Sequence, residues 1–325
     1  LHSTSRRQRQ MCIRDSGAAV AALASCTNEE VLNVAQNKAI SFESFVGKST
    51  KAIGDIDENN PLSAFYVFGG YGEDKNSVDF TNVFNNTKVN ADGTAETIEY
   101  WNDQYYQFVG YSDGNQKLEN ATIKNGVLYI PAYTVGEKDL IASNVKDHGT
   151  QKGTVNMTLK HLLAKVKFTF TSTIPVGYEV EISNLQFEAD KDGAYTGAIG
   201  DATGQWEIGT PSADKTYSFN ITNPVKINAT GDETAVSDEF YVIPQNPSLT
   251  ITFTGILKDD NGTEITRKNF TSTMSATWIS NNAYNYTAEL TQEKFDLNDN
   301  NIIKFEPNVK PWEDETISPV TPDFQ

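Results

Sequence analysis

From about residue 38 onward, apolar and polar residues alternate along the chain with a period of two, not with the 3.6-residue period of a helix. Such runs predict β-strands with one buried and one solvated face, as in antiparallel sheets stacked into a sandwich. Turn-forming pairs such as Asn125-Gly126 and Asn261-Gly262 separate the runs. The clearest apolar series are Val155, Met157 and Leu159; Val166, Phe168 and Phe170; Val176, Tyr178, Val180 and Ile182; Tyr217, Phe219 and Ile221; Leu249, Ile251 and Phe253; and Tyr284, Tyr286, Ala288 and Leu290. The pattern predicts an all-β chain.

The alternation changes parity once, near the middle of the chain. Inward positions are odd from Val155 to Leu163 and even from Val166 onward. We therefore expect a bulge, or a crossing from one sheet to another, near residues 162–165. Since 325 residues are enough for two domains, we place a boundary there. This predicts a signal segment at 1–26, β-sandwich domains at 27–162 and 163–300 in direct contact, and a C-terminal segment at 301–325.

The N-terminal region has the layout of an export signal. Residues 16–27 carry no charge and follow four arginines, and the run is too short to span a membrane as a helix. Its end, Leu23-Ala24-Ser25-Cys26, resembles a bacterial lipobox, which predicts a lipid on Cys26. A cysteine in an ordinary cleaved signal is the alternative. Residues 1–15 do not look like the start of a signal, and we interpret them as a fragment boundary or a sequencing artefact.

Composition narrows the possible partners. The chain has 26 Lys and Arg against 43 Asp and Glu, a formal charge of −17. Loss of residues 1–25 removes four Arg and one Asp, which takes the charge to −20. Nucleic acid is excluded as a partner because binding it requires a basic face. Only one of the two cysteines, Cys26, would remain, so no disulfide is expected.

Catalytic motifs are mostly absent. His161 falls on the apolar side of its strand, which predicts a packed, hydrogen-bonded side chain, and we expect His148 to be solvated in a turn. No nucleophile and base form a recognisable pair. Alternating oxygen ligands at Asp55, Asp57 and Asn59 do not continue as an EF-hand loop. The sequence therefore predicts no enzyme activity, no cofactor and no metal site.

The two ends of the chain share one apolar spacing. Near each end, apolar residues stand at offsets of zero, two and six, and both series could fill the same groove. Pro307 lies between the second and third of the C-terminal series, and proline cannot donate to a ladder, so that strand should lie at an edge or be added from outside. Two ordinary edge strands are the alternative. The two series are Ile40, Phe42 and Val46, and Ile303, Phe305 and Val309.

Several short motifs, in order, carry a family resemblance over nearly the whole exported chain. They are Leu23 to Cys26; Ile40-Ser41-Phe42; Ser49-Thr50-Lys51-Ala52; Tyr100-Trp101; Tyr106-Gln107-Phe108; Asp139-Leu140-Ile141-Ala142; Leu159 to Val166; Tyr241-Val242-Ile243-Pro244-Gln245; Trp278; Tyr284-Asn285-Tyr286; and Val309-Lys310-Pro311-Trp312. In these the sequence resembles the fimbrillin-like, or Mfa-like, subunits of type V pili, which Gram-negative bacteria export as lipoproteins. The resemblance implies two transthyretin-like antiparallel β-sandwich domains in tandem and a structural role in a fimbria at the outer membrane and cell surface, with cell adhesion as the function.

The resemblance also implies a mode of assembly. A protease cuts after a basic residue beyond the first strand, which here would be Lys51, with Lys48 as the alternative. Loss of the placeholder strand, with Ile40, Phe42 and Val46, opens a groove, and donor-strand exchange fills it from another subunit. The implied donor anchors are Ile303, Phe305, Val309 and Trp312. The implied partners are copies of this chain or related pilins, the protease, and the lipid anchor of the precursor.

A second function fits the same sequence. The chain could instead be a monomeric surface lipoprotein, or the tip or anchor subunit of a pilus, that binds a host glycan or protein. In that case aromatic side chains would stack on sugar rings, although the same residues could equally pack a strand or a domain contact. The candidate residues are Trp101, Tyr105, Tyr106 and Tyr111.

Overall fold

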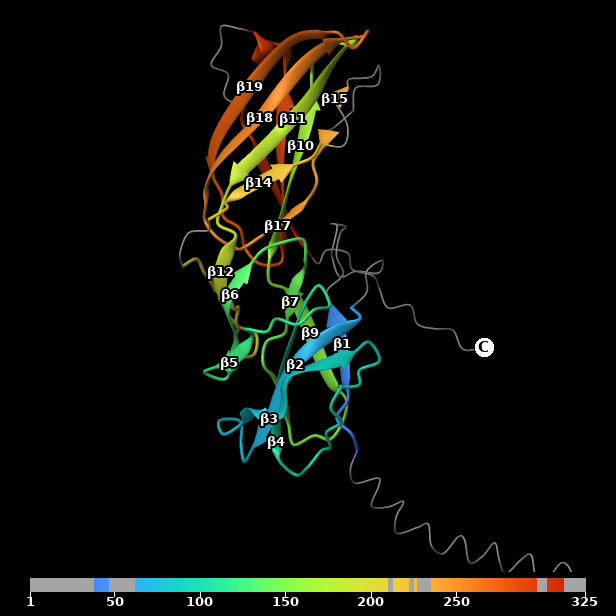
Figure 1. The fold of residues 1–325 in the computed structure, drawn as a ribbon, viewed down its shortest axis with the longest axis vertical. Coiled ribbons are helices and arrows are strands. Elements are labelled where there is room, and N and C mark those ends of the chain that lie inside the picture. Colours follow the sequence, from blue (N-terminus) through green and yellow to red (C-terminus); the bar gives the residue numbers. More distant parts are fainter. Residues whose placement is uncertain are drawn as a thin grey trace, which may run out of the picture.

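The computed structural model describes residues 38–46, 62–209, 213–221, 225–226, 235–296 and 303–312. The described chain is built of strands, with one short 3₁₀ turn, η1, at Gln292–Phe295. The predicted all-β class is confirmed. The strands form four sheets along an elongated molecule, with β10, β11 and β18 at one end and β2, β3 and β4 at the other (Figure 1).

The N-terminal half contains two of these sheets. The larger has the order β1-β9-β7-β4-β2-β3, with β8 also paired to β4, and the smaller has the order β13-β12-β6-β5. The strands of the larger sheet are β1 Phe42–Val46, β2 Ala64–Gly72, β3 Asp79–Asn90, β4 Tyr105–Asp113, β7 Leu140–Ala142, β8 Lys146–Gly149 and β9 Val155–His161. Those of the smaller are β5 Thr122–Lys124, β6 Val127–Thr134, β12 Asp192–Thr196 and β13 Gln205–Glu207.

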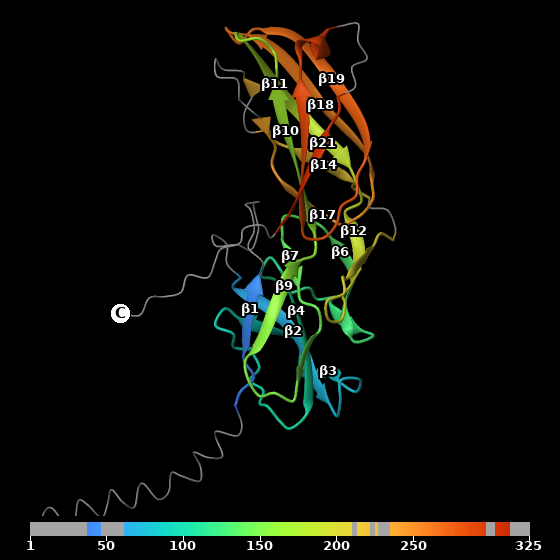
Figure 2. The same cartoon turned by 180° about the vertical axis from the view of Figure 1, so that it is seen from behind.

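The C-terminal half contains the other two sheets, packed as a sandwich. One has the order β16-β10-β20-β21 with β17 on β10, and the other β14-β11-β18-β19 with β15 on β11. Figure 2 shows β21 from behind, alongside the other strands of this half. The strands are β10 Ala164–Ser172, β11 Tyr178–Glu188, β14 Thr216–Phe219, β15 Val225–Lys226, β16 Ala235–Val236, β17 Phe240–Val242, β18 Ser248–Asp259, β19 Glu264–Ser275, β20 Asn282–Leu290 and β21 Glu306–Pro311. Pairing is antiparallel except between β1 and β9 and between β10 and β20.

The change of parity marks the crossing between halves. Val155, Met157 and Leu159 alternate as buried residues along β9, residues 161–165 are all buried, and the next alternating series begins at Val166 on β10, which belongs to a different sheet. The chain thus crosses from one sheet to another at Leu162 and Leu163, and no bulge is needed. The chain returns to the N-terminal half after this crossing, because β12 pairs with β6 there. A domain boundary at 162/163 remains a proposal, and it would leave residues 192–207 in a sheet of the first half.

One irregularity opens a sheet of the C-terminal half. The β11–β18 register runs from Tyr178 opposite Asp259 to Ser183 opposite Thr254, and then shifts to Gln186 opposite Thr252. One extra residue on β11 makes this a bulge, and Asn184 within it has φ +52°. Bulges bend a strand and increase its twist, and the β11–β18 ladder ends directly after this one.

The left-handed conformation at Asn184 gives the first prediction. Asn184→Gly should unfold with nearly unchanged free energy because glycine adopts this conformation freely. Asn184→Val should lose about 1–2 kcal/mol, since a β-branched side chain is strained there. Urea denaturation of both variants checks this. Equal stabilities would show that the bulge does not depend on the residue.

Candidate assembly sites at the two ends of the chain

The N-terminal strand is hydrogen-bonded on both sides. On one side, the main-chain N–H groups of Ile40 and Phe42 donate to the carbonyls of Glu99 and Gly93 at 2.8 and 2.9 Å. On the other, Val155 N–H donates to Ser41 O at 2.9 Å, and β1 continues parallel to β9. Residues 39–46 therefore lie between the segment 93–101 and β9, and they join the two.

The inward side chains of this strand fill an aromatic core. Ile40 and Phe42 are each only 4% exposed. The Phe42 ring lies edge-on to Phe65, Phe84 and Phe108, with centroid distances of 5.9, 5.6 and 5.6 Å. Burying each such side chain contributes about 1.5–3 kcal/mol. Together the two side chains thus contribute about 3–6 kcal/mol of apolar burial.

Gly93 lets the covering segment approach this strand closely. It has φ +79°, and a Cβ at this position would lie 1.9 Å from Phe42 O. No side chain can occupy that space, so the hydrogen bond from Phe42 N–H to Gly93 O depends on glycine.

The main chain of Val46 pairs with Leu159 at the end of β1. Cys26, Lys48 and Lys51, with the signal segment 1–26, lie outside the described residues. Of the predicted N-terminal site, the structure therefore describes the strand and not the cut.

The C-terminal segment occupies the core of its own half. Ile303 and Phe305 are buried, and the Phe305 ring packs edge-on to Phe168 and Phe170 at 5.4 and 5.8 Å. Ser272 Oγ donates to Ile303 O at 2.6 Å. Val309, the third of the predicted donor anchors, is not buried within its own chain. It is 48% exposed, like the other residues of β21, which are all exposed.

β21 is an edge strand, and its free edge has a single main-chain donor. Among the described strands it pairs only with β20, and Trp312 N–H donates to Asn281 O at 2.9 Å. Main-chain groups of an antiparallel strand alternate between its two sides, so positions 307, 309 and 311 face away from β20. Two of these are Pro307 and Pro311, which leaves Val309 as the one N–H on that edge. The predicted edge position of Pro307 is confirmed.

Trp312 is fully buried where β9 passes into β10. Its indole stacks on the His161 imidazole at 4.0 Å with an interplanar angle of 5°, and on Tyr241 at 5.7 Å. Lys165, on β10, places its Nζ 4.2 Å from the centroid of the Trp312 indole, which is a cation–π contact. His161 Nδ1 lies 3.0 Å from Asp139 Oδ1, so the prediction of a packed, hydrogen-bonded histidine is confirmed. Through Trp312, the C-terminal segment thus contacts both β9 and β10.

Comparison with known proteins identifies the fold. The sequence matches the fimbrillin-like family over residues 50–312. The chain belongs to the fimbrillin-like family. A comparison with curated protein sequences gives no match.

Solved structures support the same fold for this fimbrillin-like chain. A fimbrial protein from Bacteroides vulgatus superposes with a TM-score of 0.61 at 12% identity, over 85% of this chain and all of that one. A candidate cell adhesion protein from Bacteroides ovatus gives 0.49 at 12% identity, covering 86% of this chain and 99% of that one. A candidate cell adhesion protein from Parabacteroides distasonis gives 0.49 at 12%, covering 88% and 98%. The first of these carries the structural argument, and it shows the fold alone.

The aromatic residues expected to stack on sugars in the fimbrillin-like chain are mostly buried. Trp101, Tyr106 and Tyr111 are each at most 2% exposed, so that interpretation is wrong for them. Tyr111 donates its hydroxyl to Asn86 Oδ1 at 2.7 Å, and Tyr105 is half-buried. Alternation does not distinguish an outward aromatic from one covered by a crossing segment, which is why the sequence misled here.

His148 also differs from its prediction. It lies on β8 rather than in a solvated turn, and its ring stacks on Trp101 at 4.8 Å with an interplanar angle of 15°. Burial, together with the charge of Lys146, lowers its pKa below the ordinary value of 6.5. The neutral imidazole is thus part of the aromatic core that also holds Phe42.

Within the described ranges, no group of three or more His, Cys, Asp or Glu is placed to hold a metal ion. The same part of the chain contains no helix with the length and hydrophobicity to cross a membrane.

The lowered pKa of His148 predicts an acid-sensitive N-terminal half. Because the unfolded chain binds the proton more readily than the folded one, the free energy of unfolding should fall as pH drops below about 6.5 toward the folded pKa. His148→Gln should reduce that fall. Urea denaturation at pH 7 and pH 5 measures it, and an identical pH dependence in the variant would contradict this role.

Trp312 and Val309 form a matched pair for testing the C-terminal attachment. Trp312→Ala should cost about 3–5 kcal/mol, because it removes a fully buried indole from between His161 and Tyr241. Val309→Ala, on the exposed edge, should stay within about 0.5 kcal/mol. Chemical denaturation compares the two, and a small effect of Trp312→Ala would mean that the segment is not fastened there.

Proposed function

We propose that this chain is a non-enzymatic structural subunit of a surface fimbria, assembled by protease-triggered donor-strand exchange and serving cell adhesion. The observation that supports this most is the placement of residues 39–46 between the segment 93–101 and β9. A strand that joins two separate edges leaves an open groove when it is removed, rather than a frayed end.

The groove would have defined chemistry. Its sides would be the main-chain groups now paired with residues 39–46, at Gly93, Glu99 and β9. Its floor would be the rings of Phe65, Phe84 and Phe108 that now surround Phe42. Such a groove takes an extended strand with an aliphatic and an aromatic residue two positions apart, because main-chain bonds give affinity and pockets for alternate side chains give specificity.

The C-terminal segment of another copy, or of a related pilin, meets that requirement. Ile303 and Phe305 would take the places of Ile40 and Phe42, and Val309 that of Val46. The trigger would be a cut after Lys51, or alternatively Lys48, in a precursor anchored to the outer membrane by a lipid on Cys26. The chain would then lie at the cell surface, within the fimbria.

The cis placement of the C-terminal segment explains why a cut would be needed. Ile303, Phe305 and Trp312 already fill sites in their own half, so moving them to another subunit exchanges one set of buried contacts for a similar one. The free energy of apolar burial is therefore similar in the two positions, and no net gain drives the exchange while residues 39–46 still occupy the groove. Release of that strand makes the exchange favourable, because the empty groove exposes aromatic surface until a donor covers it.

Val309 allows assembly to be tested separately from folding. Val309→Asp should unfold like the unaltered protein, because the side chain is half exposed in the subunit. After treatment with a Lys-specific protease, the unaltered protein should form ladders resistant to sodium dodecyl sulfate. The Val309→Asp variant should stay monomeric, because the Val46 position would then receive a carboxylate.

Asn308→Asp supplies the matched control, since it adds the same charge one position along on the opposite face of β21, and it should still form ladders. Lys51→Gln and Lys48→Gln identify the cut. Cleavage near Lys51 that yields only monomers, with residues 303–312 intact, would falsify the proposal. A monomer of this kind would favour the surface lipoprotein or the tip or anchor subunit.

A further inference from the structure

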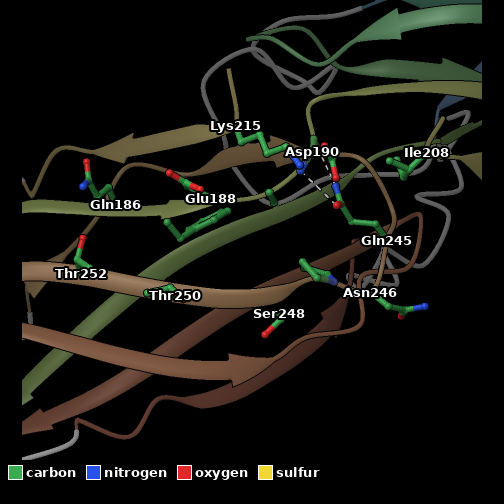
Figure 3. A pocket seen from close by; sticks show the side chains of 13 residues that line it. Gln186, Glu188, Asp190, Ile208, Lys215, Gln245, Asn246, Ser248, Thr250 and Thr252 are labelled. Carbon is green, nitrogen blue, oxygen red and sulfur yellow. Dashed lines mark hydrogen bonds and ion pairs between the residues drawn. The ribbon is translucent and has the colours of Figure 1, made fainter. Parts of the chain in front are cut away.

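The C-terminal sandwich contains a polar cleft that the assembly does not use. It has a volume of about 740 Å³ and lies where β11 and β18 separate (Figure 3). Both strands continue past their last shared pair, Gln186 and Thr252, but each stays paired only on its other side, β11 with β14 and β18 with β19. The sheet forks, and the bulge at Asn184 lies directly before the fork.

The fork leaves main-chain groups facing the cleft. Ala189 N–H donates to Lys215 O beside β14 at 3.0 Å, so alternation turns the main-chain groups of Glu188 toward β18. The register that would continue the ladder, Glu188 opposite Thr250, is not formed. The cleft therefore offers main-chain donors and acceptors in addition to side chains.

Both ends of the cleft are closed. The Gln186–Thr252 pair closes one end. At the other, the Gln245 amide bonds the main chain of Asp190, with Nε2 donating to Asp190 O at 2.7 Å and Asp190 N–H donating to Oε1 at 3.3 Å. The Asp190 carboxylate pairs with Lys215 at 2.8 Å. An added peptide strand needs an open end through which to continue, so this closed cleft fits a compact ligand better.

The side chains of the cleft have unused hydrogen-bonding capacity. Figure 3 shows Gln186 and Glu188 on one strand and Thr250 and Thr252 on the other, on either side of the cleft. Among the described residues, the Glu188 carboxylate has no hydrogen-bond or ion-pair partner. The remaining polar lining is mostly hydroxyl and amide, from Asn246, Ser248, Thr250, Thr252 and Gln186.

This chemistry selects a class of ligand. Hydroxyl and amide groups both donate and accept, and a carboxylate accepts two bonds; sugar hydroxyls are the complementary groups. Anions are disfavoured, because Lys215 is already paired and Glu188 adds a negative charge to a chain of net charge −17. Ile208 and Pro247 add small apolar surfaces to the walls, against which the C–H face of a sugar ring can pack.

We propose that the cleft between β11 and β18 binds a neutral oligosaccharide, with Glu188 and Thr250 as its main hydrogen-bonding side chains. The volume lies within the range of about 300–1,000 Å³ typical of ligand sites, and it leaves room for more than one sugar ring. This site is independent of the groove and of the C-terminal segment, so binding requires neither cleavage nor assembly.

The test is titration of the full chain with neutral oligosaccharides, followed by calorimetry or amide chemical shifts. Mannotriose, cellotriose and N-acetyllactosamine are suitable probes, and sialyllactose is the anionic comparison. At least one neutral sugar should bind in the micromolar to millimolar range. Glu188→Gln and Thr250→Val should each weaken it by about tenfold, as expected for the loss of a hydrogen bond to or from a bound ligand.

Two variants outside the cleft serve as controls. Thr273→Val changes the residue paired with Thr250 on β19, and Glu289→Gln removes an exposed carboxylate on the other sheet. Both should bind as the unaltered protein does, and Val309→Asp should too, which separates this site from assembly. The inference is overturned if no neutral sugar binds at high millimolar concentration, if both cleft variants bind normally, or if sialyllactose binds more tightly than neutral sugars.

Discussion

The hydrogen bonds that join residues 39–46 to both the segment 93–101 and β9 place this strand in the N-terminal core. Side chains of successive residues in a strand point to opposite faces. Hydrogen bonding along both edges of this strand therefore directs Ile40 and Phe42 inward, and the rings of Phe65, Phe84 and Phe108 surround Phe42. The C-terminal half repeats the arrangement with Phe305 among Phe168 and Phe170. Each end of the chain therefore completes a core that the intervening residues leave open.

The periodicity of the sequence predicted the strands and their buried faces, but not which strands pair with one another. The alternation at Val155, Met157 and Leu159 and again at Val166 and Phe168 gave the buried faces and located the crossing, because burial on one face is a local property of a strand. The parallel pairing of β1 with β9 joins residues more than 100 positions apart, such as Phe42 and Val155, and the ring packing of Phe42 on Phe108 is also a long-range contact. No local pattern records such contacts. The position of Trp312 had a weak signal in Lys165, a charge within an apolar run.

The wrong predictions and the missed cleft both come from long-range packing, which a local pattern does not record. His148 was expected to be solvated in a turn and Trp101 was a candidate for stacking on sugars, yet the two rings stack on each other in the structure. The cleft between β11 and β18 was missed for the opposite reason, since Gln186, Glu188 and Thr250 follow a regular outward pattern and only the bulge at Asn184 separates their strands. Alternation gives the face of a residue, and long-range packing decides what lies against that face.

Pro307 and Pro311 on the outer edge of β21 affect how the protein behaves in solution. Cross-β aggregates grow by adding strands to an edge with a continuous row of N–H and C=O groups. An edge with a single N–H, at Val309, is a poor template for such growth. Copies of the chain can therefore accumulate at high local concentration without this edge starting fibril growth. The same prolines are compatible with β-pairing on the other side of the strand, where β20 supplies the hydrogen bonds.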